Sequence, residues 1–402
     1  MLAINSDNKT NKINKHPLVA GCLLLGLATI PDVMVVPVLK ELTVDRFGIS
    51  EGDAHYFMAV NLLGALLAIG VLAVLNRAVS STVLLLGSAI ISSVLMAAMA
   101  VTTSWGAFLT LRCLEGGADL MLLAIPLRII ASAGGKERFA GRMGGGFTVM
   151  MVGMAIGVVA GGKIGSNDPV MVLWAGAATM LLITLIVVFL RKTIDNVPAS
   201  PRPEPKNCPL LPKEWIGAGF LALDRGLAAL VSTTLPILLA SGFAIGSVTL
   251  GVALGGMFLA LAVFAAPFGI LADRCGGGKI RLVASVLCGG SLACLGLLIW
   301  LPPVIVLPPC LLLYGVGAAG SLPSAFSVAV RQEASNLVFS SLQAAGQAGY
   351  AFGVLGGMVL VSVISLPPAT LLTVMFPIAG LLFIILNVLL LVGIRTLEMR
   401  VP

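Results

Sequence analysis

The segment Leu109-Thr110-Leu111-Arg112-Cys113-Leu114-Glu115-Gly116-Gly117-Ala118-Asp119 places three ionisable residues in an otherwise apolar run from Trp105 to Ile130. About 20 apolar residues are enough to cross the ~30 Å hydrocarbon core of a bilayer as a helix. Arg112, Glu115 and Asp119 recur at i, i+3 and i+7, so they share one face of that helix. Each charge at bilayer depth costs roughly 2.5–3.5 kcal/mol, so these residues require partners or water inside a larger bundle.

The composition of the whole chain is that of a polytopic membrane protein. Of its 402 residues, 58% are hydrophobic and only 10% are charged, against about 25% charged in soluble domains. The formal charge of +7 follows from the loops and does not indicate nucleic-acid binding. The chain has two His and no HExxH or paired CxxC motif, and residues 276–280 do not satisfy the phosphate-loop pattern. We therefore expect no enzyme, no metal site and no bound cofactor.

Twelve apolar runs follow one another along the chain. We predict that each is a transmembrane helix, because an open strand cannot satisfy its backbone hydrogen bonds in lipid. The fold class is therefore an all-α polytopic membrane protein. The pairs Pro302-Pro303 and Pro308-Pro309 form either loops or kinks. The number of predicted helices can change by one at these two positions. The runs cover residues 17–41, 53–75, 82–101, 104–131, 139–162, 169–190, 214–239, 243–271, 280–301, 304–329, 338–364 and 368–393.

Positive charge in the connecting segments gives the orientation. If the N-terminus is cytoplasmic, 19 of the 24 Lys and Arg residues, Arg281 among them, fall in cytoplasmic segments. Three fall on the opposite side, and Arg112 and Arg225 lie within the membrane. This bias places both termini in the cytoplasm. We predict an integral plasma (inner) membrane protein of bacterial type, surrounded by lipid and without nucleic-acid partners.

A Pro-rich stretch divides the chain into two halves. Six prolines between residues 191 and 213 predict an extended cytoplasmic linker. It joins an N-terminal six-helix bundle, residues 17–190, to a C-terminal six-helix bundle, residues 214–394, with cytoplasmic tails at 1–16 and 395–402. Proline and glycine positions recur between the halves, for example Pro37 and Pro236, which indicates two pseudo-symmetric bundles. Repeated halves are typical of secondary transporters with a binding site near the midplane.

Two motifs resemble those of the major facilitator superfamily. The segment from Gly269 to Gly276, Gly-Ile-Leu-Ala-Asp-Arg-Cys-Gly, is similar to the family's loop signature, and an eroded copy in the first half has Val74 where the Asp belongs. The segment from Arg112 to Ala118 resembles the family's Arg-x-x-x-Gly motif, whose Arg is associated with proton coupling. The chain is thus similar to these transporters over essentially its whole length.

The resemblance implies that the first, fourth, seventh and tenth helices line a central cavity. At 1.5 Å per residue, Asp32 and Arg112 lie at similar depths, roughly 8–12 Å below the outer surface, so we expect them to pair. Asp224 lies about two turns deeper, near the level of Glu115 and Asp119. We predict that Asp32, Arg112, Glu115 and Asp224 couple proton movement to transport, although the first pair can also be a fixed structural contact.

Other polar residues in the predicted helices are candidates for substrate contact or packing. Gln343, Gln347 and Tyr350 recur at i, i+4 and i+7 as one polar stripe, which contacts substrate or bonds to a neighbouring helix. For Asp119, nearer the cytoplasmic end of its helix, we expect a structural pair with Arg142. The predicted substrate cavity comprises Asn61, Met150, Arg225, Tyr314, Gln343, Gln347 and Tyr350.

A glycine series in the fifth helix resembles the family's antiporter motif, with Val158 in place of its Pro. Its four-residue spacing lets helices approach closely, so we predict a gating contact between the halves, with a counterpart in the eleventh helix. Asp273 of the loop signature is expected to face a helix N-terminus and hold the inner gate shut. The predicted gating residues are Gly153, Gly157, Gly161, Gly162, Asp273, Arg274, Gly349 and Gly353.

Together these features predict a secondary active transporter that works by alternating access, as a monomer, on a small-molecule substrate. The favoured function is proton-coupled antiport (efflux) of a small amphipathic or drug-like molecule, because the glycine motif is common in proton-driven exporters and the cavity charge is mixed. The first alternative is a proton-coupled symporter that imports a small anionic metabolite, with Arg112 binding its carboxylate or phosphate. A distant alternative is a non-transporting membrane sensor or scaffold. The proton gradient supplies the energy.

Overall fold

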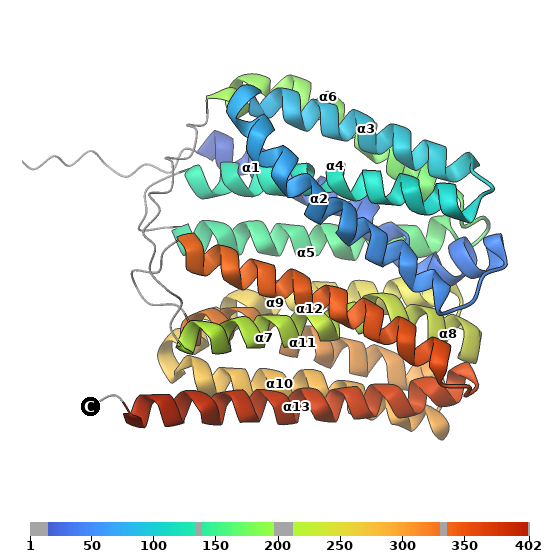
Figure 1. Ribbon diagram of the computed structural model, residues 1–402, viewed down its shortest axis with the longest axis vertical. Helices are drawn as coiled ribbons and strands as arrows, with labels where there is room; N and C mark the ends of the chain where they lie inside the picture. The colour runs from blue at the N-terminus through green and yellow to red at the C-terminus, as the bar shows by residue number, and fades with distance from the viewer. Residues whose placement is uncertain (1–14, 134–138, 197–211, 330–335, 401–402) are drawn as a thin grey trace, which may run out of the picture.

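The computed structural model describes residues 15–133, 139–196, 212–329 and 336–400, and every regular element in these ranges is helical (Figure 1). Five short 3₁₀ or π segments interrupt or extend the long helices: η1 (Val36–Val38), η2 (Glu41–Asp45), η3 (Asp53–His55), η5 (Leu230–Thr234) and η6 (Cys294–Ile299). The first half holds α1 (Lys15–Met34), α2 (Tyr56–Ala78), α3 (Ser81–Val101), α4 (Trp105–Ser132), α5 (Phe139–Ile164) and α6 (Met171–Asp195). The second holds α7 (Pro212–Ala229), α8 (Leu235–Phe243), α9 (Ser247–Cys275), α10 (Gly277–Ala293), α11 (Pro303–Ala329), α12 (Asn336–Val363) and α13 (Pro368–Arg400).

The helices form two bundles that lie side by side (Figure 1). In the first bundle α1 packs on α4, α5 and α6, while α2 packs on α4 and α3 on α6. In the second bundle α7 packs on α11, α12 and α13, and α10 lies between α11 and α13. Helix α5 packs along α9 and joins the two bundles. Residues 197–211, most of the predicted linker, lie outside the described residues.

Eleven segments of the described chain are long and apolar enough to cross a membrane. α7, η5 and α8 form one of these, Glu214–Phe243, and α10 with η6 forms another, Gly277–Ile299. α4 completes the predicted twelve, and it differs from the others because it carries Arg112, Glu115 and Asp119 within 28 residues. α11 begins at Pro303, so the first proline pair ends a loop and the second lies inside the helix.

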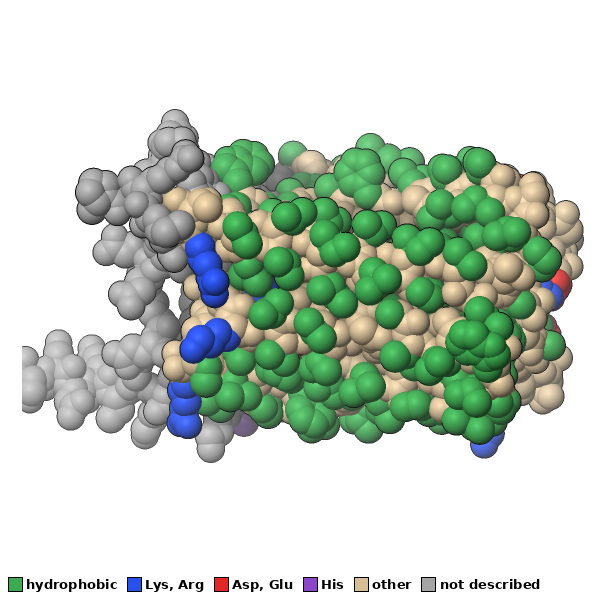
Figure 2. All heavy atoms as spheres, turned by 90° about the horizontal axis from the view of Figure 1, so that it is seen from below, with side chains coloured by type: hydrophobic (Ala, Val, Ile, Leu, Met, Phe, Trp, Pro, Cys, Tyr) green, Lys and Arg blue, Asp and Glu red, His purple; other side chains and the backbone are tan. Residues whose placement is uncertain are grey.

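The outer flank of the molecule is covered with hydrophobic side chains, while Lys and Arg gather mainly at one end (Figure 2). This end, where α1 begins and α13 ends, is here called the terminal face, and the opposite end is called the far face. The apolar flank is what a surrounding bilayer requires. The prediction that the terminal face is cytoplasmic rests on loop charge and stays a prediction.

Candidate functional site

A buried ionic cluster joins α4 to α1 in the first half and is here called the N-half cluster (Asp32, Arg112, Glu115 and Asp119). The Arg112 side chain is 1% exposed and donates to Asp32 Oδ1 at 3.0 Å. It also pairs with Glu115, one helical turn along the same face. The Phe57 ring of α2 lies 4.7 Å from the guanidinium carbon. Such a cation–π contact stabilises a desolvated guanidinium further.

Glu115 is held from three helices. Its two carboxylate oxygens accept hydrogen bonds from Ser92 of α3 at 3.1 Å and from Asn61 of α2 at 3.2 Å. Gly116 makes this possible, because a Cβ there would lie only 2.1 Å from the Asn61 carbonyl oxygen. The Gly of the Arg-x-x-x-Gly segment therefore lets α2 approach α4 closely enough for Asn61 to reach the carboxylate.

Asp119 completes the N-half cluster. It is 6% exposed, and its Oδ1 has no hydrogen-bond partner among the described residues. Its carboxyl group lies close enough to Asp32 for an electrostatic interaction, and Asp32, which is 30% exposed, is the most accessible carboxyl group of the N-half cluster. Three carboxyl groups thus surround one guanidinium. If all were ionised, the cluster would bury two uncompensated negative charges, an arrangement that desolvation strongly disfavours.

A second buried pair, here called the C-half cluster (Asp224, Arg281 and Asn387), joins α7 to α10 and α13. Arg281 is fully buried and binds both oxygens of Asp224, at 2.6 and 2.7 Å. Its Nε donates to Asn387 at 2.7 Å, and its remaining donors reach the carbonyl oxygens of Ser321 and Phe220. The Phe220 ring lies 4.4 Å from the guanidinium carbon. This cluster is electrically balanced, and the Asp–Arg geometry is bidentate.

A π turn in the α7–α8 segment presents polar side chains toward the other helices. From this turn, η5, Ser232 lies 3.1 Å from the Tyr350 hydroxyl of α12. Two residues on, Thr234 contacts His55 Nε2 of the first half at 3.0 Å. His55 is fully buried, and its Nδ1 lies 3.0 Å from the Glu51 carbonyl oxygen. Single π turns inside helices often occur at functional sites.

The two halves pack tightly near the far face. A Cβ at Gly162 of α5 would lie 2.4 Å from the Ser247 carbonyl oxygen of α9, and Ser247 donates to the Gly162 carbonyl at 3.0 Å. One turn along, Val158 is fully buried among side chains of the second half. By contrast, Gly145 of α5 and Gly269 of α9, near the terminal face, have open space beside them. The contact between the halves is therefore concentrated at the far face.

Comparisons with known proteins agree with this architecture. Residues 21–223 match the sequence model of the Major Facilitator Superfamily. The chain belongs to this superfamily. No curated protein sequence matches it.

Solved transporter structures share the superfamily fold with this chain. A bacterial homologue of the human lysosomal transporter Spinster, inward-facing and occupied, aligns with a TM-score of 0.72 at 12% identity, covering 96% of this chain and 97% of its own. The tetrameric peptide-transporter homologue PepTSo2 aligns at 0.73 and 13%, covering 97% and 100%. The nucleoside transporter NupG aligns at 0.66 and 14%, covering 94% and 98%. These likenesses concern the fold alone.

The structure corrects several predictions for this superfamily member. Arg281 does not lie in a loop, because α10 begins at Gly277 and directs this arginine inward. Asp224 consequently belongs with Arg281 rather than with Glu115 and Asp119. Arg142 does not pair with Asp119: it donates to the carbonyl oxygens of Ile130 and Ala131, which lie about 16 Å further along α4 than Asp119.

The predicted gating contact between the halves is also wrong for most glycines of the two series, in α5 and in α12. A Cβ at Gly153, Gly157 or Gly161 would meet the α1 backbone of the same half. Gly349 and Gly353 likewise pack on α7. Gly162 does lie between the halves, and so does Gly357 at the end of the α12 glycine series, whose Cβ would meet Thr234 and His55. The glycines thus mainly permit close helix packing within each half.

The predicted cavity residues fall into different places. Tyr314 is 5% exposed within the core of the second half, so it does not line a cavity. Asn61 belongs to the N-half cluster. Met150 is half-buried, and its carbonyl oxygen accepts from Thr29. Arg225 and Gln347 are exposed, whereas the side chain of Gln343 lies outside the described part of the chain.

The predicted inner latch is not formed in this conformation. Asp273 and Arg274 are exposed at the end of α9 and have no hydrogen bond or ion pair with another described residue. This agrees with the separation of the halves there.

Several site residues were missed by the sequence analysis. They are His55, Phe57, Ser92, Ser232, Thr234, Arg281 and Asn387. Asn387 had a usable signal, since it is the single polar residue in the apolar run 371–391 other than Thr373.

Proposed function

We propose that this protein is a proton-coupled secondary active transporter of a small molecule, and that the N-half cluster is its proton site. The observation that carries the proposal is the excess of two carboxyl groups around Arg112 at a buried site. A cluster of this composition approaches neutrality by holding protons, whereas the balanced C-half cluster has no need of them. Alternating access is supported by the superfamily fold and by the concentration of contacts at the far face.

Asp32 is the entry point for the proton in this proposal. It is the accessible member of the cluster, bonds to Arg112 and interacts electrostatically with Asp119. A proton that arrives on Asp32 weakens its bond to Arg112 and can be shared with Asp119, while Arg112 remains paired with Glu115. A substrate that reaches Asp32 competes with the proton. We therefore propose antiport of a small amphipathic molecule as the first candidate.

A second candidate, proton-coupled uptake of a small anion, is favoured by one observation. Arg225 is exposed within the α7 span and makes no ion pair with a described residue. A cation in this position attracts an anionic substrate, which would then move together with a compensating proton.

Proton flux in proteoliposomes tests the proposal. Candidate compounds are added to vesicles containing an entrapped pH-sensitive dye, with the purified protein or with Asp32→Asn or Glu115→Gln. We expect substrate-dependent proton flux in the wild type, at least tenfold less in both variants, and unchanged flux in Asp195→Asn, which removes an exposed carboxylate at the end of α6. Full coupled flux in both cluster variants would exclude the N-half cluster, and the direction of flux separates antiport from symport. Accumulation of no compound would favour a sensor or scaffold.

A further inference from the structure

α7 carries a charged residue that the two clusters leave without a partner. Arg225 lies inside the spanning segment Glu214–Phe243, is exposed, and has neither a hydrogen bond nor an ion pair with another described residue. Its neighbour Asp224 is already bound at both oxygens by Arg281. A guanidinium at this depth costs roughly 2.5–3.5 kcal/mol or more in lipid, so its side chain requires water or an anion.

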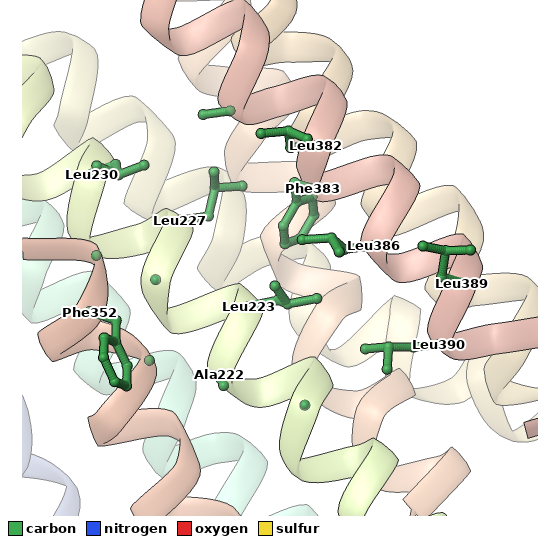
Figure 3. Close-up of a pocket in the computed structure, with 15 residues that line it drawn as sticks. Ala222, Leu223, Leu227, Leu230, Phe352, Leu382, Phe383, Leu386, Leu389 and Leu390 are labelled. Atoms are coloured by element: carbon green, nitrogen blue, oxygen red, sulfur yellow. The ribbon is translucent and has the colours of Figure 1, made fainter. Parts of the chain in front are cut away.

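An apolar groove lies along one side of α7. The groove has a volume of about 600 Å³ and lies between α7, α12 and α13, with Leu223, Leu227, Leu230 and Phe352 among its lining residues (Figure 3). At 100° per residue, Arg225 points roughly 140–160° away from the three leucines. Its side chain is therefore directed away from this groove.

Arg225 lies on the α12 side of α7, because a Cβ at Gly346 of α12 would be 3.4 Å from Arg225 Cγ. Ser232 follows in the π turn η5, seven residues further along the same spanning segment. Ser232 contacts the Tyr350 hydroxyl at 3.1 Å, and Tyr350 lies within electrostatic reach of both Arg225 and Asp32 of the first half. This face of α7 thus looks toward the region between the two halves.

The α12 side of the same region is open toward the terminal face. Gly346 lies beside the Arg225 stem, where a Cβ would be 3.4 Å from Arg225 Cγ. On the α12 face that carries Tyr350, Val354 is fully buried, whereas Gln347, two turns nearer the terminal face, is exposed. An approach to the exposed Arg225 from the terminal face is consistent with these exposures.

We propose that Arg225 binds the acidic group of the transported molecule, and that the substrate is a small organic anion bearing a carboxylate or phosphate. Tyr350 and Ser232 supply hydroxyl groups for a second polar group of the same molecule. Arg112 and Arg281 cannot serve in this way, because both are buried and already bound to carboxylates. The inference rests on the proposed transport function but holds for either direction of proton coupling.

Thiol labelling tests the position of Arg225 without any ligand. Arg225→Cys and Leu223→Cys are made in a cysteine-free background and treated with a membrane-impermeant, charged methanethiosulfonate reagent. The two sites are two residues apart on opposite sides of α7, which makes Leu223 a matched control. We expect Arg225→Cys to react at least tenfold faster. Equal rates, or faster labelling at position 223, would overturn the proposal.

Ligand binding tests the substrate class. Thermal stability of the detergent-solubilised protein is measured with a panel of small carboxylic acids and phosphate monoesters, each beside its uncharged methyl ester or amide. We expect stabilisation by at least one acid and not by its neutral analogue, and a loss of affinity of roughly tenfold or more in Arg225→Gln. Affinity should be retained in Arg225→Lys and in Arg191→Gln, which removes an exposed arginine at the end of α6. No response to any acid, or an unchanged response in Arg225→Gln, contradicts the inference.

The relative response to carboxylates and phosphates identifies the acidic group. The binding measurement needs no proton gradient, so its outcome is separable from that of the proton-flux experiment. Acid binding without proton flux would refute the proposed coupling alone. Proton flux without acid binding would refute only the role of Arg225.

Discussion

The two halves of the molecule bury an arginine in the same way but balance its charge differently. In each half, the guanidinium lies over a phenylalanine ring and bonds to an aspartate from the first helix of that half. Arg281 meets one carboxylate and is otherwise bound by an amide and backbone oxygens. Arg112 meets two carboxylates, with a third close by.

This difference separates a structural cluster from one that can change its charge. The C-half cluster is neutral with all of its groups ionised, so it can stay unchanged through a transport cycle. The N-half cluster has three carboxyl groups around one arginine, so it is neutral only when it holds two protons, which is the basis of the proposed proton coupling. Pseudo-symmetry of the backbone therefore does not imply symmetry of function.

The largest expected effect comes from leaving one member of the balanced pair alone. Arg281→Leu strands Asp224 and should destabilise the protein by roughly 3–5 kcal/mol. The double variant Asp224→Leu, Arg281→Leu should recover most of this loss, because no charge remains buried without a partner. Thermal unfolding of the purified variants gives the comparison. A double variant as unstable as the single one would show that the pair is not a balanced structural unit.

Neutralising one aspartate in each cluster should affect stability in one case and proton flux in the other. Asp224→Asn leaves Arg281 without its counter-ion and should lower stability by roughly 2–4 kcal/mol. Asp119→Asn replaces a carboxyl group that the proposal holds protonated with a neutral group of the same shape, so its stability should change by about 1 kcal/mol or less. The proton flux per substrate should fall in Asp119→Asn alone. Equal loss of stability in the two variants would abolish the distinction between the clusters.

Losing a neutral hydrogen-bond partner should cost less than losing either member of the Asp224–Arg281 ion pair. Asn387→Ala removes an acceptor from a charged guanidinium and should cost roughly 1.5–3 kcal/mol. Ser92→Ala removes a donor to Glu115 and should cost about 0.5–1.5 kcal/mol if that cluster carries protons. Thermal unfolding of the two variants, side by side, measures the difference. A larger loss in Ser92→Ala than in Asn387→Ala would indicate that Glu115 is permanently ionised.

The sequence predicted the fold and the Asp32–Arg112 pair of the N-half cluster, but not the C-half cluster. Apolar run lengths gave the helices, and depth along the first and fourth helices was enough to place Asp32 beside Arg112. The C-half cluster was missed because Arg281 follows Gly276-Gly277-Gly278-Lys279, a stretch typical of a loop, and only tertiary packing turns its side chain inward. The glycine series was misassigned because spacing predicts a close contact but does not identify the helix that makes it.

The roles of these residues in transport stay predictions, whereas their positions are now described. The sequence could not show that Arg112 is bound to two carboxylates while Arg225 forms no ion pair with a described residue, since ion pairing depends on neighbours from distant segments. It also could not pair His55 with Thr234, which are separated by 179 positions.

The π turn in the α7–α8 segment has a mechanical consequence. Ser232 and Thr234 lie on one distorted turn, yet Ser232 meets Tyr350 inside the second half and Thr234 meets His55 of the first. Any rotation of this turn strains both contacts together. If Arg225 binds substrate as proposed, a substrate that draws Tyr350 toward Arg225 would weaken the Thr234–His55 contact between the two halves at the far face. Substrate binding and the opening of the far face would then depend on the movement of one helical turn.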